Sequence, residues 1–118
     1  AKINYDGKTF IIGSNGRLIN KKFNNNYLPY IFGSPETKEF LKLKKKIDLS
    51  KFSYDQIKNF YFYPSKRWDL ELKDGIRIKL SNLNIVKSLN QSFEFLNLKN
   101  LRDIKIIDLR VKNQIIIK

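Results

Sequence analysis

The sequence contains no cysteine, no histidine and no methionine among its 118 residues. Without cysteine there is no disulfide framework, an absence that fits the cytosol and a well-cored periplasmic domain equally. Without cysteine and histidine the usual zinc ligands are missing, which argues against a zinc site. The lack of even a first methionine predicts that the chain is a piece of a longer protein. No apolar run approaches the ~20 residues of a membrane-spanning helix.

Recognisable catalytic motifs are missing as well. The sequence has no P-loop, no glycine-rich dinucleotide turn, no carboxylates at metal-ligand spacing and, without histidine, no Ser–His pair. The closest carboxylates, Asp69 and Glu71, lie two residues apart in a predicted strand, where Lys79 and Arg77 oppose them. We therefore interpret this pair as structural, and we expect neither an enzyme nor a cofactor.

Acidic residues are scarce: 11 Asp and Glu stand against 24 Lys and Arg, which gives a formal net charge of +13. A surplus of this size is typical of proteins that bind nucleic acid or an anionic membrane surface. The competing interpretation is codon drift in an AT-rich genome, because 19 lysines, 13 asparagines and 16 isoleucines make up 48 of the 118 residues. Composition alone leaves both interpretations open.

Residues 66–80 predict a β-hairpin, because apolar and charged residues alternate on both sides of Asp74-Gly75. A two-residue loop at Asp74-Gly75 would set apolar against charged residues across the two strands. A three-residue loop with Gly75 in the left-handed conformation aligns both patterns. The predicted cross-strand pairs are Trp68–Leu80, Leu70–Ile78 and Leu72–Ile76 on an apolar face, with Asp69–Lys79 and Glu71–Arg77 as ion pairs on a solvent face.

The remaining pattern predicts one α+β domain over residues 1–118, with a mostly antiparallel twisted sheet and helices packed on one of its faces. Two helix-start signals occur: Ser34-Pro35-Glu36, and the capping-box spacing of Ser53 and Gln56. The lysine run 44–46 is interpreted as the cationic end of the first helix. Strands are expected within 1–19 and at 60–63, 104–112 and 115–117, and helices at about 35–45, within 49–59 and within 81–97.

Two apolar segments allow more than one interpretation. The four aromatic residues 60–63 would stack on bases in a nucleic-acid reader, but alternation predicts that one pair packs in the core and the other lies on a sheet face. The final strand, 115–117, is apolar on both faces, which makes an exposed edge prone to aggregation. Either it lies centrally in the sheet, or a partner strand adds to it by β-augmentation.

Four segments, in the same order along the chain, resemble the extracytoplasmic β domain of the bacterial cell-division family FtsQ, called DivIB in Gram-positive bacteria. Residues 66–76 (KRWDLELKDGI) resemble its Arg-Trp, Leu-x-Leu and Asn/Asp-Gly hairpin, and residues 107–110 (IDLR) its Val/Ile-Asp-Leu-Arg. Residues 28–33 (LPYIFG) resemble its Leu-Pro-x-Leu-x-Gly before a helix, and residues 14–19 (SNGRLI) its Asp-x-x-Gly-x-Val/Ile hairpin. The sequences of these four segments are most similar to those of the alphaproteobacterial branch of the family.

The resemblance implies a non-catalytic scaffold of the divisome, a single-pass inner-membrane protein whose cytoplasmic tail, membrane helix and POTRA domain are absent from this sequence. This β domain would lie in the periplasm and bind FtsB and FtsL, with a segment of FtsB adding a strand beside the last strand. Basic side chains at the site would pair with carboxylates of FtsB. Carried over by position, the partner-binding residues would be Lys66, Arg67, Arg110, Val111, Lys112, Asn113, Ile115, Ile116 and Ile117.

The competing hypothesis is a basic module that binds nucleic acid or an anionic surface. Its support is the net charge and the aromatic run 60–63. It predicts polyanion binding that falls steeply with salt and weakens when Tyr61 or Tyr63 is replaced. We prefer the scaffold hypothesis, which expects no small-molecule substrate and no nucleic-acid partner.

Overall fold

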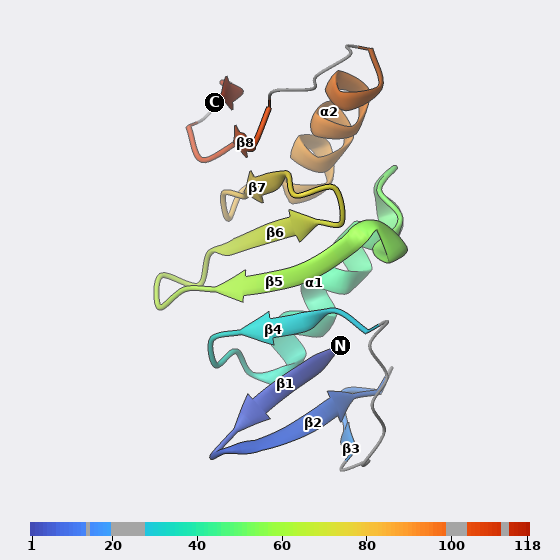
Figure 1. Ribbon diagram of the computed structural model, residues 1–118, viewed down its shortest axis with the longest axis vertical. Coiled ribbons are helices and arrows are strands. Elements are labelled where there is room, and N and C mark those ends of the chain that lie inside the picture. Colours follow the sequence, from blue (N-terminus) through green and yellow to red (C-terminus); the bar gives the residue numbers. More distant parts are fainter. Residues whose placement is uncertain (14, 20–27, 99–103, 112–113) are drawn as a thin grey trace.

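A single nine-stranded sheet organises the computed structural model, which describes residues 1–13, 15–19, 28–98, 104–111 and 114–118 (Figure 1). The strands lie in the order β3-β2-β1-β4-β5-β6-β7-β8-β9. Two helices accompany them, α1 (Thr37–Leu49) and α2 (Ile85–Leu98), together with a short 3-10 helix, η1 (Tyr54–Gln56). The strands are β1 (Lys2–Tyr5), β2 (Lys8–Ile12), β3 (Leu18–Ile19), β4 (Tyr30–Phe32), β5 (Ile57–Phe62), β6 (Trp68–Leu72), β7 (Arg77–Lys79), β8 (Ile106–Asp108) and β9 (Ile116–Ile117).

The sheet is mixed but mostly antiparallel, which confirms the predicted α+β class. The pairs β1–β4, β4–β5 and β7–β8 are parallel and the other neighbouring pairs are antiparallel. Parallel neighbours need a long crossover connection. The two helices supply it for two of these pairs, since α1 connects β4 to β5 and α2 connects β7 to β8, whereas β2 and β3 lie between β1 and β4 in the sequence.

One row of cross-strand neighbours forms the core face of the sheet. Most of its members are at most 1% exposed, and α1 packs on them, with Phe40 meeting the ring of Phe60 edge to face at 5.2 Å. Leu89 of α2 is fully buried in the same apolar cluster, so both helices cover this face. The row runs through Phe10, Ile3, Ile31, Phe60, Leu70, Ile78, Ile107 and Ile117.

The hairpin has the register that its sequence predicts. Asp69 lies opposite Lys79, Leu70 opposite Ile78 and Glu71 opposite Arg77. The turn is closed by the Gly75 N–H, which donates to the Leu72 carbonyl at 2.9 Å, and Gly75 has a φ of 92°. The Leu72 N–H donates to the Ile76 carbonyl at 2.8 Å, which confirms the three-residue loop, and Gly75 takes the left-handed conformation that favours glycine.

The first helix begins and ends later than predicted. Its N-cap is Glu36, not Ser34, and no side chain caps the first turn. The carbonyl of Pro35 instead accepts a hydrogen bond from the Tyr5 hydroxyl. The helix continues to Leu49 because Ile47, which is 0% exposed, extends the buried stripe of the helix. The lysine run 44–46 consequently lies within the helix, and of these lysines only Lys46 belongs to its last turn.

Two further local predictions are confirmed. Ser53 and Gln56 form the predicted capping box, although it opens a single 3-10 turn, and β5 starts at once with Ile57. In the aromatic run, Phe60 is fully buried and Phe62 packs against the core, whereas Tyr61 and Tyr63 bind side chains on the opposite face of the sheet.

The strand predicted over 104–112 is too long. β8 spans Ile106–Asp108, because the Asp108 carboxylate accepts a hydrogen bond from the Arg110 N–H at 3.0 Å and turns the chain. Val111, which follows this turn, is 46% exposed. Predictions that fall on residues 14, 20–27, 99–103 and 112–113 lie outside the described residues.

Candidate functional site

The C-terminal end of the sheet is an open edge. β9 is the last strand in the sheet order, and among the described residues it pairs with β8 alone. Lys118 and Ile106 exchange both backbone hydrogen bonds, at 3.0 and 3.1 Å. Because bonded and non-bonded pairs alternate along an antiparallel ladder, Ile117, opposite Ile107, directs its N–H and C=O to the free edge. Ile115, which precedes this strand, is 38% exposed.

Arg110 lies next to this edge and is held by Asp108. Its Nε donates to Asp108 Oδ1 at 2.9 Å and its Nη2 donates to Oδ2 at 2.6 Å, which is a two-bond, fork-to-fork contact. These hydrogen bonds lower the pKa of Asp108 from 3.8 to about 2, and they raise the pKa of Arg110. The Arg110 side chain is still 44% exposed, so it presents a positive charge in a fixed orientation.

A second ionic cluster surrounds Asp69 on the face of the sheet that the helices leave open. The Asp69 side chain is 1% exposed and accepts hydrogen bonds from Arg67, from Arg77 Nε at 3.0 Å and from the Tyr63 hydroxyl at 3.0 Å. Arg77 also donates to the Tyr63 oxygen at 2.6 Å. Hydrogen bonds from three donor side chains offset the cost of burying the Asp69 carboxylate. The same bonds hold these side chains in fixed conformations.

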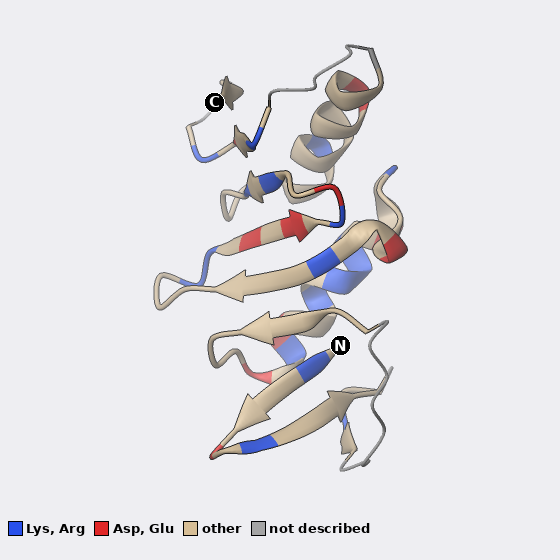
Figure 2. Cartoon of the chain, viewed as in Figure 1, with Lys and Arg blue, Asp and Glu red and all other residues tan. Residues whose placement is uncertain are grey.

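The two ion pairs predicted from the hairpin register, Asp69–Lys79 and Glu71–Arg77, do not form. The strand register is as expected, but Asp69 binds Arg77, the diagonal residue, and not Lys79. The twist of the two strands brings such diagonal neighbours within reach of a long side chain. Glu71 accepts hydrogen bonds from Asn59 at 2.6 Å and from the Tyr61 hydroxyl at 3.2 Å. The predicted solvent face is therefore a partly buried polar layer (Figure 2), in which β6 carries the acids and β7 the bases.

The tyrosine rings of this face already stack on other side chains of the domain. Tyr61 stacks on Phe32 at 5.0 Å with 10° between the rings, and the Arg77 guanidinium lies over Tyr61 at 4.1 Å. Phe32 belongs to β4 and Arg77 to β7, on either side of β5 and β6. Arg67 covers Tyr63 in the same way at 4.6 Å. Contacts within the domain thus occupy the Tyr61 ring from two sides and the Tyr63 ring from one, which weakens the aromatic support for the nucleic-acid hypothesis.

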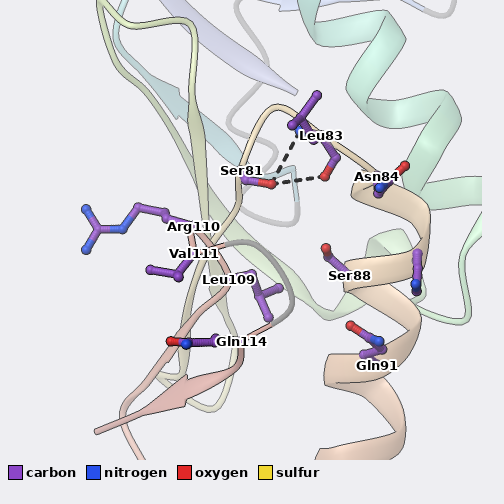
Figure 3. A pocket seen from close by; sticks show the side chains of 10 residues that line it. Ser81, Leu83, Asn84, Ser88, Gln91, Leu109, Arg110, Val111 and Gln114 are labelled. Carbon is purple, nitrogen blue, oxygen red and sulfur yellow. Dashed lines mark hydrogen bonds between the residues drawn. The ribbon is translucent and has the colours of Figure 1, made fainter.

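A cavity of about 230 Å³ opens between the start of α2 and the chain that follows β8 (Figure 3). Ser88 and Gln91 lie on the α2 side, and Leu109 and Gln114 line the other wall. The Arg110 side chain points away from α2 in this view. The Gln114 N–H donates to the Val111 carbonyl at 3.1 Å and so closes the turn before β9.

The structure brings together some of the predicted partner-binding residues and separates others. Arg110, Val111 and the segment 115–117 share the open edge. Arg67 belongs to the Asp69 cluster, which is linked to this edge through the row Asp69, Lys79, Asp108 and Ile116. Lys66 does not: it lines a groove beside α1. Lys112 and Asn113 lie outside the described residues.

The sequence analysis did not predict that residues just before α2 help to line the cavity next to the β9 edge. Leu83 is 70% exposed and lines the cavity with Val111. One signal was available, because Leu83 is an apolar residue out of phase with the buried stripe of the following helix. The polar residues Ser88 and Gln91 carried no such signal, since they resemble any solvent-facing positions.

The described part of the chain has neither a metal-ligand cluster nor a membrane-spanning helix. No three ligand-type side chains gather there into a group that could hold a metal ion. Neither described helix has the length and apolarity needed to cross a bilayer.

Comparison with known proteins identifies the family. A search of curated proteins found no match to the chain. The family model described as cell division protein FtsQ/DivIB, C-terminal, matches residues 1–110. The match is to the family as a whole, and it ends at Arg110, just before the open edge strand. The chain therefore belongs to the FtsQ/DivIB family of non-enzymatic cell-division proteins, as a C-terminal domain with a role in cell division.

Proposed function

We propose that this domain is a divisome scaffold that binds FtsB, together with FtsL, through strand addition at β9. The observation that carries the proposal is the free outer side of β9, where Ile117 directs its backbone N–H and C=O away from β8. An unpaired edge of this kind is a template for an added strand. Family membership supplies the setting, because the family acts in division.

The charge around this edge supports an acidic partner segment. Arg110 is exposed and rigidly oriented, and Lys105 and Lys118 flank the β8–β9 pair. Among the described residues of β8 and β9, the one carboxylate side chain is that of Asp108, and it is already bound by Arg110. A carboxylate of FtsB can reach the Arg110 donors that Asp108 leaves free, while apolar partner residues cover Ile115 and Val111.

A pair of proline variants tests strand addition. Ile117→Pro removes an N–H that faces the free edge, so the fold should remain and binding of a peptide from the C-terminal region of the cognate FtsB should fall at least tenfold. Ile116→Pro is the matched control, because the N–H of Ile116 faces β8 and its loss should lower the melting temperature instead. In the unmodified chain, the peptide should protect the Ile117 amide from hydrogen exchange.

A charge reversal tests the role of Arg110. Arg110→Glu should abolish peptide binding, whereas Arg17→Glu, the same reversal at the exposed residue before β3, should leave it unchanged. Isothermal titration gives both affinities, and a thermal melt of each variant shows whether it is folded. Full affinity in Arg110→Glu together with Ile117→Pro would contradict strand addition at this edge.

The same proposal sets the location of the domain. Residues 1–118 act as one β domain on the periplasmic side of the inner membrane, carried by a longer chain with a single membrane helix. The family match supports this arrangement. Its test is protease accessibility of the full-length protein in spheroplasts, where cleavage of this domain without lysis is expected and protection would contradict the location.

A further inference from the structure

A groove of about 350 Å³ lies on the helix side of the molecule, away from the β9 edge. Its floor is apolar and rigid, because Leu43, Trp68 and Ile85 are between 2% and 9% exposed. Its rim carries four lysines and one carboxylate, Glu39. The four lysines are Lys38, Lys42, Lys46 and Lys66.

The lysines converge from two separate segments. Lys38, Lys42 and Lys46 follow one another at spacings of four in α1, which places them in a line along one side of the helix. Figure 2 shows how densely basic residues occupy α1. Lys66 reaches the groove from the turn before β6, where its backbone has a φ of 65°. A left-handed backbone is uncommon for lysine and occurs mainly in tight turns such as this one.

This turn also separates Lys66 from its neighbour. The Lys66 N–H donates to the Tyr63 carbonyl at 2.8 Å, and the Tyr63 N–H donates to the Arg67 carbonyl at 3.0 Å. Arg67 then binds Asp69 on the open face of the sheet, while Lys66 lines the groove on the helix side. Two adjacent cations thus serve opposite faces of the molecule.

The groove lysines have little internal compensation. Among the described residues Lys38 pairs with Glu36 at 3.1 Å, in a contact whose two side chains are 72% and 66% exposed, and Lys42, Lys46 and Lys66 form no ion pair. Lys44, on another side of the same helix, pairs with Asp48 at 3.0 Å. Like charges four residues apart destabilise a helix. AT-rich drift explains many lysines, but it does not explain their convergence from α1 and a strained turn.

Four convergent ammonium groups indicate a multiply charged anion. On the open face of the sheet, Arg67, Arg77 and Arg110 use their planar forks on carboxylates. The cations of the groove are all lysine ammonium groups, which act as compact point charges and are common phosphate ligands. We propose that this groove is a second binding site, for a phosphate-bearing anion: either a free phosphate compound or the headgroup of an anionic phospholipid.

Two probes and a matched pair of variants test the groove. The 118-residue chain is titrated with inorganic pyrophosphate, and separately with vesicles of phosphatidylcholine with or without 30% phosphatidylglycerol, while the lysine side chains are followed by NMR. Lys42→Ala/Lys66→Ala should weaken binding about tenfold or more. Lys45→Ala/Lys73→Ala removes the same charge at exposed lysines that do not line the groove, so it should change affinity less than twofold.

Each outcome has a defined meaning. Saturable binding of pyrophosphate identifies a free phosphate compound as ligand, and binding only to vesicles with phosphatidylglycerol identifies a lipid headgroup. An equal loss in both double variants would show that the net charge binds anions without a site, and no binding to either probe at low salt would also overturn the proposal. Because Ile117→Pro should retain the groove, failure here and failure at the β9 edge are distinguishable.

Discussion

Replacing Asp108 by asparagine tests how the ion pair beside the edge contributes to stability. The variant keeps the shape of the side chain and an oxygen for the Arg110 N–H, but it removes the negative charge that receives the guanidinium. Lowering the pKa of Asp108 from 3.8 to about 2 corresponds to roughly 2 kcal/mol of stabilisation by linkage. Because the Arg110 side chain is 44% exposed, solvent and salt screen the pair, and we expect about 1 kcal/mol.

The pH dependence of this contribution has a definite sign. The folded state lowers the pKa of Asp108, so it favours the ionised form. The stabilisation is present in full above the ordinary pKa of 3.8 and is lost as the pH falls towards about 2. Neither the asparagine side chain nor the arginine titrates in this range, so the difference between the two proteins isolates the carboxylate.

Urea unfolding of both proteins between pH 2 and pH 7 measures this contribution. The free energy of unfolding of the unmodified chain should exceed that of Asp108→Asn by a constant amount above pH 5, and the two should converge as the pH falls through the window from 3.8 to about 2. The difference should also shrink in 1 M salt. A difference that is absent at pH 7, or that stays constant down to pH 2, would refute this account of the Arg110–Asp108 pair.

Two further substitutions test the fold that supports the site. Gly33→Ala should destabilise the chain by more than ~2 kcal/mol, because a Cβ there would lie 2.4 Å from the Phe62 carbonyl oxygen at a φ of 103°; Gly7→Ala, with open space around it and a φ of 78°, should cost ~1–2 kcal/mol for its backbone alone. Equal losses in chemical denaturation would contradict the close approach. Tyr63→Phe should cost ~1–3 kcal/mol, because buried Asp69 loses a donor and Arg77 an acceptor. Tyr30→Phe serves as its control, since no described residue bonds the Tyr30 hydroxyl; a neutral Tyr63→Phe would mean that the hydroxyl adds nothing to the cluster.

The hairpin shows what a sequence can determine. Apolar and charged residues alternate independently in residues 66–80, and only one loop length satisfies both patterns, so the register follows from the sequence. The choice of ionic partners does not follow, because it depends on twist and on burial. Asp69 selects Arg77 over its direct neighbour Lys79, and Tyr63 and Arg67, from outside the predicted pairs, complete the cluster.

Element ends and cavities depend on tertiary contacts that no local pattern contains. The first helix passes its expected end because Ile47 finds a buried place in the core, and β8 stops early because Asp108 turns back to Arg110. The cavity beside α2 joins residues that are more than twenty positions apart in the sequence, such as Ser88 and Gln114. The two alternatives for the final strand are a case in point: its apolar pattern fits either a central or an edge strand, and the sheet order makes it an edge.

The basic residues around β9 affect which strands can pair with its open edge. An apolar edge strand invites pairing with a second copy of itself, which would lead to dimers or aggregates. Antiparallel pairing of two β9 strands, however, would bring Lys118, Arg110 and their copies from the second molecule into one cluster of cations. Like charges in such a cluster repel, whereas an acidic strand gains the same contacts with attraction. In the proposed strand addition, the basic surroundings of β9 would therefore act against self-association and favour a partner of opposite charge.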